Sequence, residues 1–187
     1  MEDVINMDSI VQRLKTKDDT ALAEIMDLYG DDLMRLATAY MKDEALAADI
    51  VQQVFIKLYY RIDQFENKSS IYTWLYRITV NQCKTKLKSW SFRNIFFTDD
   101  LPERNADSNV EKDILDNELE DELYKEILKL DLKYRIVIIL YYYHELKISE
   151  IAEILDSNEN TIKTRLYRGR NKLKDFLTNK KGGYFNE

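Results

Sequence analysis

The chain has 187 residues, of which 45% are hydrophobic, and its formal net charge at pH 7 is -6. This length fits one ordinary domain or two small ones, and the apolar content is sufficient for a core. With only 1 Pro and 4 Gly, the sequence contains few turn-forming residues. The composition therefore argues against an all-β sandwich or barrel and favours a mainly helical protein.

Several classes of chemistry are also disfavoured. The single cysteine, Cys83, excludes a disulfide framework and a Cys-rich zinc site. The single histidine, His144, excludes most metal sites and acid–base mechanisms that depend on histidine. We expect no metal, no cofactor and no enzymatic activity, because the sequence has no Gly-rich phosphate loop, metal-ligand cluster or nucleophile–base pair. No long apolar run occurs and Met1–Ile10 is polar and acidic, so we expect a cytoplasmic protein without a membrane span or secretory signal.

The charge is distributed unevenly along the chain. Lys68–Arg93 contains basic residues and no acidic ones, for a net charge of +6, and Ser157–Glu187 has a net charge of +5. Asn94–Glu126, between them, has a net charge of -9. Clustered Lys and Arg are the electrostatic footprint of nucleic-acid binding, so the two basic blocks predict two phosphate-binding surfaces. The alternative interpretation is two solvated faces separated by an acidic linker.

Hydrophobic spacing predicts helices along the first half of the chain. Asp18-Asp19-Thr20 has the character of a helix cap, Lys42-Asp43 predicts a break, and the loop Asn67–Ser70 can cap the helix that follows it. These signals delimit three helices: Leu22–Tyr40, Glu44–Ile62 and Ile71–Ser89.

The segment Thr98–Asn109 contains the only Pro and little apolar content, which marks it as the natural domain boundary. Beyond it, spacing predicts four more helices: Val110–Leu130, Lys133–Tyr143, Ile148–Leu155 and Thr161–Leu177. We therefore predict an all-α chain made of two small helical domains joined by an acidic linker.

The last two predicted helices have the pattern of a helix-turn-helix. The first buries a stripe of Ile148, Ile151, Ala152 and Leu155, and the turn Asp156-Ser157-Asn158 follows. The second buries Ile162, Leu166, Gly169, Leu173 and Leu177, with Gly169 allowing a close helix approach. Its opposite side is basic and suits the DNA major groove. The alternative is an amphipathic surface helix with a basic outer face.

Two helices of the first domain have unusual faces. Glu44–Ile62 buries Val51, Val54, Phe55, Leu58 and Ile62, and its opposite face mixes the apolar groups Ile56 and Tyr60 with polar ones, as protein interfaces do. Ile71–Ser89 carries a basic ridge of Arg77, Asn81, Lys84 and Lys88, with Tyr72 and Trp74 near its start. Aromatic rings beside a basic ridge suit single-stranded nucleic acid. The alternative is a solvated face on each helix, and for Trp74 a core position is the favoured interpretation.

The sequence resembles the extracytoplasmic-function group of bacterial sigma-70 factors. Ala48–Phe55 (ADIVQQVF) resembles the core-polymerase-binding helix of that group, and Ser70–Ile78 with Asn81 resembles the segment of that group that binds the promoter −10 element. Ile151–Leu155 followed by Thr161–Arg170 resembles its −35-binding helix-turn-helix. Together the matched segments cover about two thirds of the chain. Position 53 is Gln where the group usually has an acid, and the turn 156–158 lacks the usual Gly.

The resemblance implies a region 2-like domain at 1–97, a linker at 98–112 and a region 4-like helix-turn-helix domain at 113–187. It also implies roles for three sets of residues. The core-binding set is Asp49, Gln52, Gln53, Phe55 and Ile56. The −10 set is Asn67, Lys68, Ser69, Ser70, Tyr72, Trp74, Arg77, Asn81, Lys84 and Lys88. The −35 set is Lys163, Thr164, Arg165, Tyr167, Arg168 and Arg170.

The resemblance further implies an RNA polymerase sigma factor that binds core RNA polymerase and promoter DNA and directs transcription initiation. It also implies regulation by an anti-sigma factor, which in this group is often membrane-anchored. The alternative function is a helix-turn-helix regulator that binds duplex DNA without being a polymerase subunit; such a regulator needs no polymerase-binding face.

Overall fold

The computed structural model describes residues 7–66, 69–97 and 118–182, with side chains for all of these except 90–97, 118–122 and 175–182. In the described residues the regular structure is helical and contains no strand, which confirms the predicted all-α class. The chain divides into two compact units, Met1–Pro102 and Glu103–Glu187, here called unit 1 and unit 2. The predicted linker at 98–112 lies outside the described residues.

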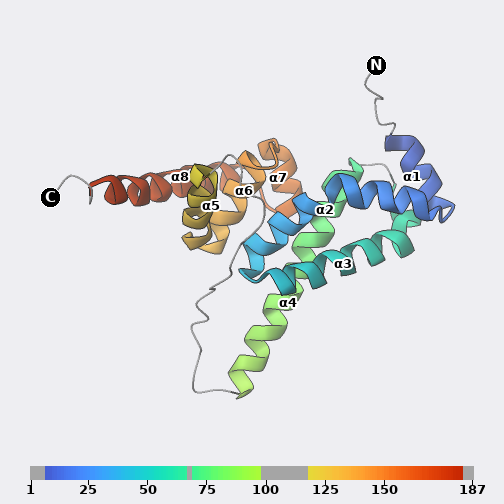
Figure 1. The fold of residues 1–187 in the computed structure, drawn as a ribbon, viewed down its shortest axis with the longest axis horizontal. Coiled ribbons are helices and arrows are strands. Elements are labelled where there is room, and N and C mark those ends of the chain that lie inside the picture. The colour runs from blue at the N-terminus through green and yellow to red at the C-terminus, as the bar shows by residue number, and fades with distance from the viewer. Residues whose placement is uncertain (1–6, 67–68, 98–117, 183–187) are drawn as a thin grey trace. The chain divides into compact units, whose positions relative to one another are not determined.

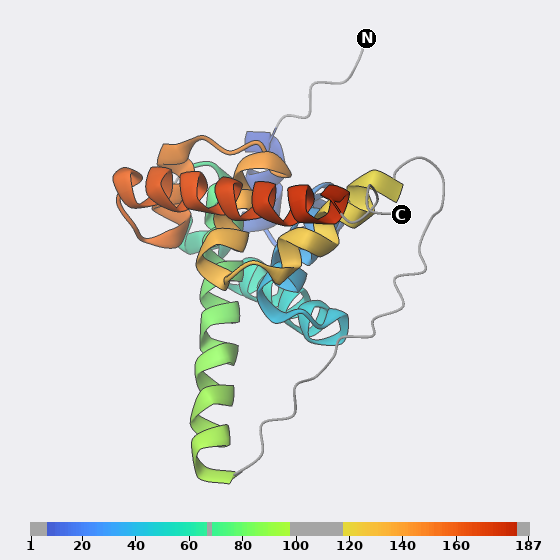
Figure 2. The ribbon, with the colours of Figure 1, turned by 90° about the vertical axis from the view of Figure 1, so that its left-hand side faces the viewer.

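Unit 1 is built on the central helix α2, which contacts α1, α3 and α4, while α3 also contacts α4. Its core contains Ile25, Leu36, Leu58 and Leu75, each fully buried. Figures 1 and 2 show the C-terminal half of α4 standing clear of the other helices of its unit. The elements are α1 (Met7–Lys15), α2 (Asp19–Met41), α3 (Glu44–Arg61), the 3-10 helix η1 (Ile62–Gln64) and α4 (Ile71–Phe97).

Local side-chain chemistry sets the helix ends of unit 1. The Asp18 carboxylate accepts a hydrogen bond from the backbone N–H of Thr20 at 2.9 Å, and Asp43 caps α3 in the same way. Between α2 and α3, Lys42 adopts a left-handed φ of 53° and donates its backbone N–H to the Thr38 carbonyl. The predicted cap and the predicted break are both confirmed.

Unit 1 differs from the prediction at both ends. Helix α1 was not predicted, although Ile10, Val11 and Leu14 are buried along one face of it. Helix α4 continues past Ser89 to Phe97 because no Pro or Gly interrupts it there. The basic ridge therefore lies on a longer helix than the sequence pattern indicated.

Unit 2 packs α8 across α6 and α7, and α5 contacts both α6 and α8 (Figure 2). The close approach of α8 to α6 depends on Gly169, because a Cβ at that position would lie 3.1 Å from Cγ1 of Ile138. This confirms the predicted role of Gly169. The helices are α5 (Glu118–Lys129), α6 (Leu132–Tyr142), α7 (Ile148–Leu155) and α8 (Glu159–Gly182). The start of the predicted helix 110–130 lies outside the described residues.

The turn between α7 and α8 follows its sequence. Asp156 adopts a left-handed φ of 53°, and the Asn158 side chain accepts a hydrogen bond from the Thr161 N–H at 2.8 Å. In α7 the predicted stripe is too narrow. Ile154 is buried, whereas the predicted positions Ile148 and Leu155 are only half-buried, because α7 packs against both α6 and α8.

Two buried side chains that could carry chemistry, those of Cys83 and Arg135, serve the packing of the fold instead. Burial raises the pKa of the Cys83 thiol to about 12, as expected for a cysteine used as a small hydrophobe. Arg135, also buried, donates hydrogen bonds to the carbonyls of Leu128 and Leu130 and so ties α6 to the end of α5. In the described part of the chain, no helix combines the length and the apolar character that crossing a bilayer requires.

Candidate functional site

The basic ridge of α4 is exposed to solvent. Arg77, Asn81 and Lys88 are exposed and Lys84 is half-buried. At 3.6 residues per turn these four positions fall within about 60° around the helix. They lie on the side of α4 opposite the buried Leu75 and Thr79, so the ridge faces away from that part of the core.

The two aromatic residues near the start of α4 point in different directions. Trp74 is half-buried, flanks the ridge and packs against Phe65 with ring centroids 5.5 Å apart. Tyr72 lies about 140° around the helix from Arg77 and packs between Tyr29 and Tyr76, with centroids at 6.2 and 4.7 Å. Trp74 is therefore the aromatic ring that accompanies the ridge, and Tyr72 faces α2.

The loop before α4 contributes a helix cap. The Ser70 hydroxyl accepts a hydrogen bond from the backbone N–H of Thr73 at 3.1 Å and contacts the Thr73 hydroxyl at 2.9 Å. Ser69 is half-buried and Ser70 is exposed. Asn67 and Lys68 of the −10 set lie outside the described residues.

The outer face of α3 carries four of the five residues in the core-binding set. Asp49, Gln52, Gln53 and Ile56 are exposed and fall within about 100° around the helix, an arc that also contains Tyr60. Ile56 is 43% exposed and Tyr60 is 73% exposed. Phe55 is only 6% exposed and belongs to the core of unit 1, so it supports this face from beneath.

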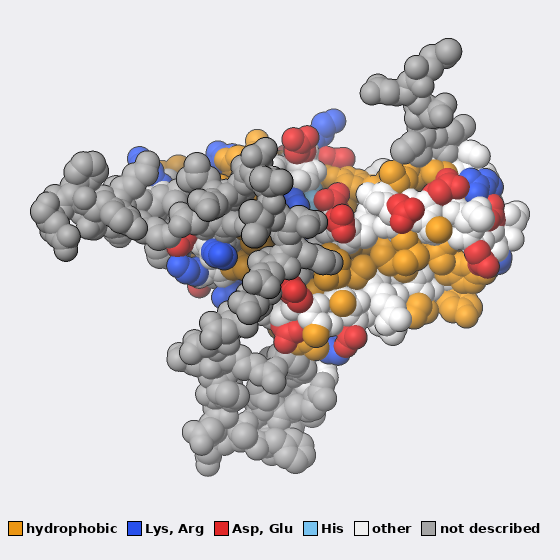
Figure 3. Space-filling view, viewed as in Figure 1, with side chains coloured by type: hydrophobic (Ala, Val, Ile, Leu, Met, Phe, Trp, Pro, Cys, Tyr) orange, Lys and Arg blue, Asp and Glu red, His pale blue; other side chains and the backbone are white. Residues whose placement is uncertain are grey.

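Exposed apolar groups on unit 1 lie among acidic ones. Figure 3 shows hydrophobic side chains over α2 and α3 with Asp and Glu side chains around them. Apolar anchors within a polar surround are the usual anatomy of a protein interface. On the outer face of α3 these anchors are Ile56 and Tyr60, whereas Met26 and Leu28 are exposed on α2 and do not belong to the core-binding set.

The outer face of α8 is basic, as predicted. Lys163, Thr164, Tyr167 and Arg168 are exposed and Arg165 is half-buried. Lys163 forms an ion pair with Glu159 at 3.3 Å, and the Thr164 hydroxyl donates to the Asn160 carbonyl. Tyr167 is 66% exposed, so its ring is accessible on this face.

Arg170 lies at one edge of the −35 set, about 20° around α8 from Lys163. Its guanidinium group lies over the rings of Tyr141 and Tyr142, 5.4 and 5.3 Å from their centroids. It is exposed and is separated from Arg165 by about 140° around α8. Cation–π contacts with two rings of α6 thus hold this side chain at the edge of the basic face.

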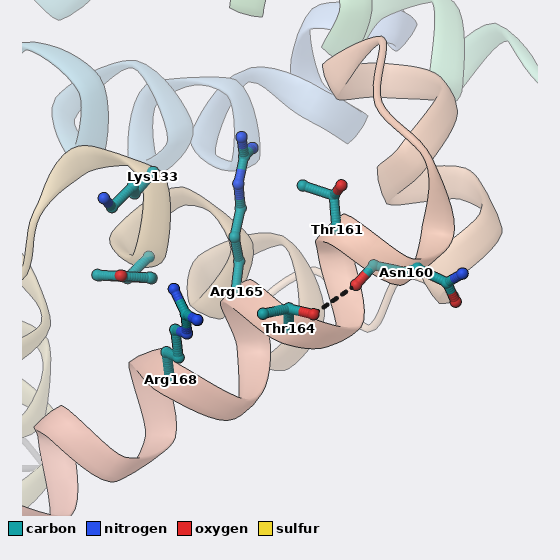
Figure 4. A pocket seen from close by; sticks show the side chains of 7 residues that line it. Lys133, Asn160, Thr161, Thr164, Arg165 and Arg168 are labelled. Carbon is teal, nitrogen blue, oxygen red and sulfur yellow. Dashed lines mark hydrogen bonds between the residues drawn. The ribbon is translucent and has the colours of Figure 1, made fainter.

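The basic face of α8 borders a hollow with a volume of about 320 Å³. Figure 4 shows Lys133 extending from α6, and Arg165 and Arg168 from α8, around the same space. Sequence reasoning missed the contribution of α6, because only the crossing of α6 and α8 brings Lys133 to the basic face of α8. The lining residues are Lys133, Tyr134, Asn160, Thr161, Thr164, Arg165 and Arg168.

Comparison with protein families matches both units. The model for Sigma-70 region 2 matches residues 25–91, which include α3 and most of α4. The model for Sigma-70, region 4, matches residues 120–173, which include α6, α7 and the first half of α8. The two matches therefore contain the faces described above.

Curated relatives match over nearly the whole chain. The ECF RNA polymerase sigma factor SigW of Bacillus subtilis is 35% identical over 176 residues, which cover 89% of this chain and 94% of SigW. The ECF RNA polymerase sigma-E factor of Escherichia coli strain K12 is 31% identical and covers 86% of this chain and 88% of its own length.

Solved structures share the fold. The sigma factor RpoE, solved in complex with the anti-sigma factor NepR from Bartonella quintana, has a TM-score of 0.71 and 25% identity, covering 83% of this chain and 96% of RpoE. CnrH, solved with the cytosolic domain of CnrY, has a TM-score of 0.64 and 18% identity, covering 90% of this chain and 95% of CnrH.

Proposed function

The chain belongs to the extracytoplasmic-function group of the sigma-70 family, and we propose that its two units divide promoter recognition between them. It is an RNA polymerase sigma factor, which binds core RNA polymerase and directs transcription initiation. The region 2 match favours this function over that of an independent helix-turn-helix regulator, which would need unit 2 alone. We propose that it acts by binding and not by catalysis.

Unit 2 binds the duplex −35 element through α8. The observation that carries this assignment is the exposed basic face of α8, with Thr164, Tyr167 and Arg168 along its outer side. Polar side chains at the start of a recognition helix can meet base edges in the major groove. Lys163, Arg165 and Arg170 flank them and neutralise phosphates.

Unit 1 holds the opened non-template strand of the −10 element. The ridge Arg77, Asn81, Lys84 and Lys88 follows the phosphates, and the half-exposed ring of Trp74 offers a stacking surface. The resemblance assigns Asn67, Lys68, Ser69 and Ser70 to the pocket for a base that leaves the stack, and the described pair Ser69 and Ser70 lies directly before α4. Tyr72 acts through the packing of α4 on α2, since its ring lies between Tyr29 and Tyr76.

The outer face of α3 binds core RNA polymerase. Ile56 is the apolar anchor within the polar residues Asp49, Gln52 and Gln53, and the buried Phe55 keeps the helix in place. An anti-sigma factor is the second protein partner, by analogy with the complex of RpoE and NepR. A competitor for this face would prevent assembly with the polymerase.

Recognition by two units of one chain strengthens binding. Once one unit occupies its DNA element, the other binds from a high effective concentration instead of from bulk solution. Phosphate contacts supply salt-dependent affinity, and base contacts supply specificity.

The division of labour can be tested on holoenzyme assembled from core polymerase and this chain. A promoter selected from random DNA is probed for duplex protection upstream and for permanganate reactivity of unpaired thymines downstream. Arg168→Gln should weaken upstream protection, and Arg77→Gln should reduce strand opening with upstream protection retained. Lys125→Gln, at an exposed position of α5, is the control. Equal impairment of both steps by both variants would contradict the assignment.

A further inference from the structure

The hollow beside α8 collects three cationic side chains from two helices. Lys133 comes from the first turn of α6, and Arg165 and Arg168 come from α8 (Figure 4). Among the described residues, none of the three takes part in an ion pair, whereas Lys163 on the same helix is paired with Glu159 at 3.3 Å. The hollow is therefore surrounded by positive charge that the described part of the chain does not neutralise.

The chemistry of the lining selects an oxyanion. Two arginines offer planar forks that match phosphate oxygens, and a lysine adds a point charge. Lys133 also stands in the first turn of α6, where the helix dipole favours negative charge. Its ammonium lies 5.0 Å from the ring centroid of Tyr134, so the ring places the cation at the edge of the hollow.

The size of the hollow is compatible with a phosphate group. Its volume of about 320 Å³ is well above the space that a single water molecule needs. A phosphate has five heavy atoms, so the hollow can hold one and leave room for the adjoining sugar or for bridging water. Thr161 and Thr164 line the side toward the start of α8, although the Thr164 hydroxyl already donates its hydrogen to the Asn160 carbonyl.

We propose that this hollow is a phosphate site shared by α6 and α8, and that Lys133 is a nucleic-acid contact outside the recognition helix. The inference rests on the proposed function, because it places the phosphate of a −35 duplex in the site. Lys133 then supplies affinity without sequence preference, and it fixes the angle at which α8 enters the groove by anchoring α6 to the backbone.

The test measures the affinity of holoenzyme for a selected promoter over a range of salt concentrations. Loss of one phosphate contact should reduce the slope of log K against log salt by about 0.9. Lys133→Gln should therefore weaken binding about five- to tenfold near 0.1 M salt, by the same factor for the selected −35 sequence and for its single-base variants. Lys125→Gln makes the same charge change on an exposed face of α5 and should leave the slope unchanged.

A second experiment distinguishes the two possible sources of the phosphate, the DNA backbone and a free phosphate compound. Sodium pyrophosphate is added to the chain at constant ionic strength and followed by phosphorus NMR. Binding that Lys133→Gln abolishes would show that the site also takes a free phosphate, and absence of binding would assign the site to the DNA backbone alone.

The proposal is overturned if Lys133→Gln leaves both the salt slope and pyrophosphate binding as in the unmodified chain, or if its effect depends on the −35 sequence. These results are distinct from a failure of the proposed function. In that case the unmodified holoenzyme itself would select no promoter.

Discussion

Replacement of Ile56 by alanine tests the α3 face as the surface that binds core polymerase. Ile56 is 43% exposed in the free chain, so association can still remove that fraction of its surface from water. Full burial of an isoleucine side chain is worth about 1.5–3 kcal/mol. The exposed fraction therefore corresponds to about 0.6–1.3 kcal/mol, or about a three- to ninefold rise in the Kd for core polymerase.

The assay is a titration of labelled core polymerase with purified chain, with Leu28→Ala as the matched control. Leu28 is 38% exposed on α2 and is outside the core-binding set. The part of Ile56 that is buried in the fold corresponds, by the same proportion, to about 0.9–1.7 kcal/mol of stability, so the variant is confirmed to be folded by circular dichroism before the titration. Unchanged core affinity for Ile56→Ala, or an equal loss for Leu28→Ala, would refute the reasoning.

Three further predictions concern the fold. Gly169→Val should lower the free energy of unfolding of unit 2 by about 1–3 kcal/mol, because its Cβ would lie 3.1 Å from Ile138; an unchanged urea midpoint would contradict the close approach. Cys83 should resist iodoacetamide at pH 8 and react after unfolding, because burial raises its pKa to about 12; rapid alkylation of the folded chain would contradict that burial. Hydrogen bonds from Thr20 and Arg13 lower the pKa of Asp18 from 3.8 to about 2, so its contribution to stability is present above about pH 4 and lost as the pH falls toward 2. Asp18→Asn should flatten that part of the acid unfolding curve, and an unchanged curve would show that the cap has no such effect.

Features that depend on neighbours in sequence were predictable. The caps at Asp18 and Asp43 and the turn at 156–158 use side chains that bond to backbone groups two or three residues away. Helical spacing also separated exposed positions from buried ones on α3 and α8. These signals are local, so they can be recognised in the sequence without knowledge of the tertiary structure.

Features that depend on how helices cross were not predictable. The direction of Tyr72 is set by Tyr29 on α2, and the hollow beside α8 requires Lys133 from α6. Ile154 is buried because α7 has two packing partners, which a single-stripe pattern does not represent. Each of these features depends on a residue from a second helix. Hydrophobic spacing within one helix does not show which other helix packs against it.

The central claim is that this chain confers promoter recognition on core RNA polymerase. The direct measurement is transcription in vitro from promoters selected with the holoenzyme, comparing core alone, the chain alone and the two combined. The account predicts specific transcripts only from the combination, with loss of initiation in a chain that carries both Arg77→Gln and Arg168→Gln. It would be contradicted if the combination associated with no promoter, or if the chain without core bound its selected sites as tightly as the holoenzyme does.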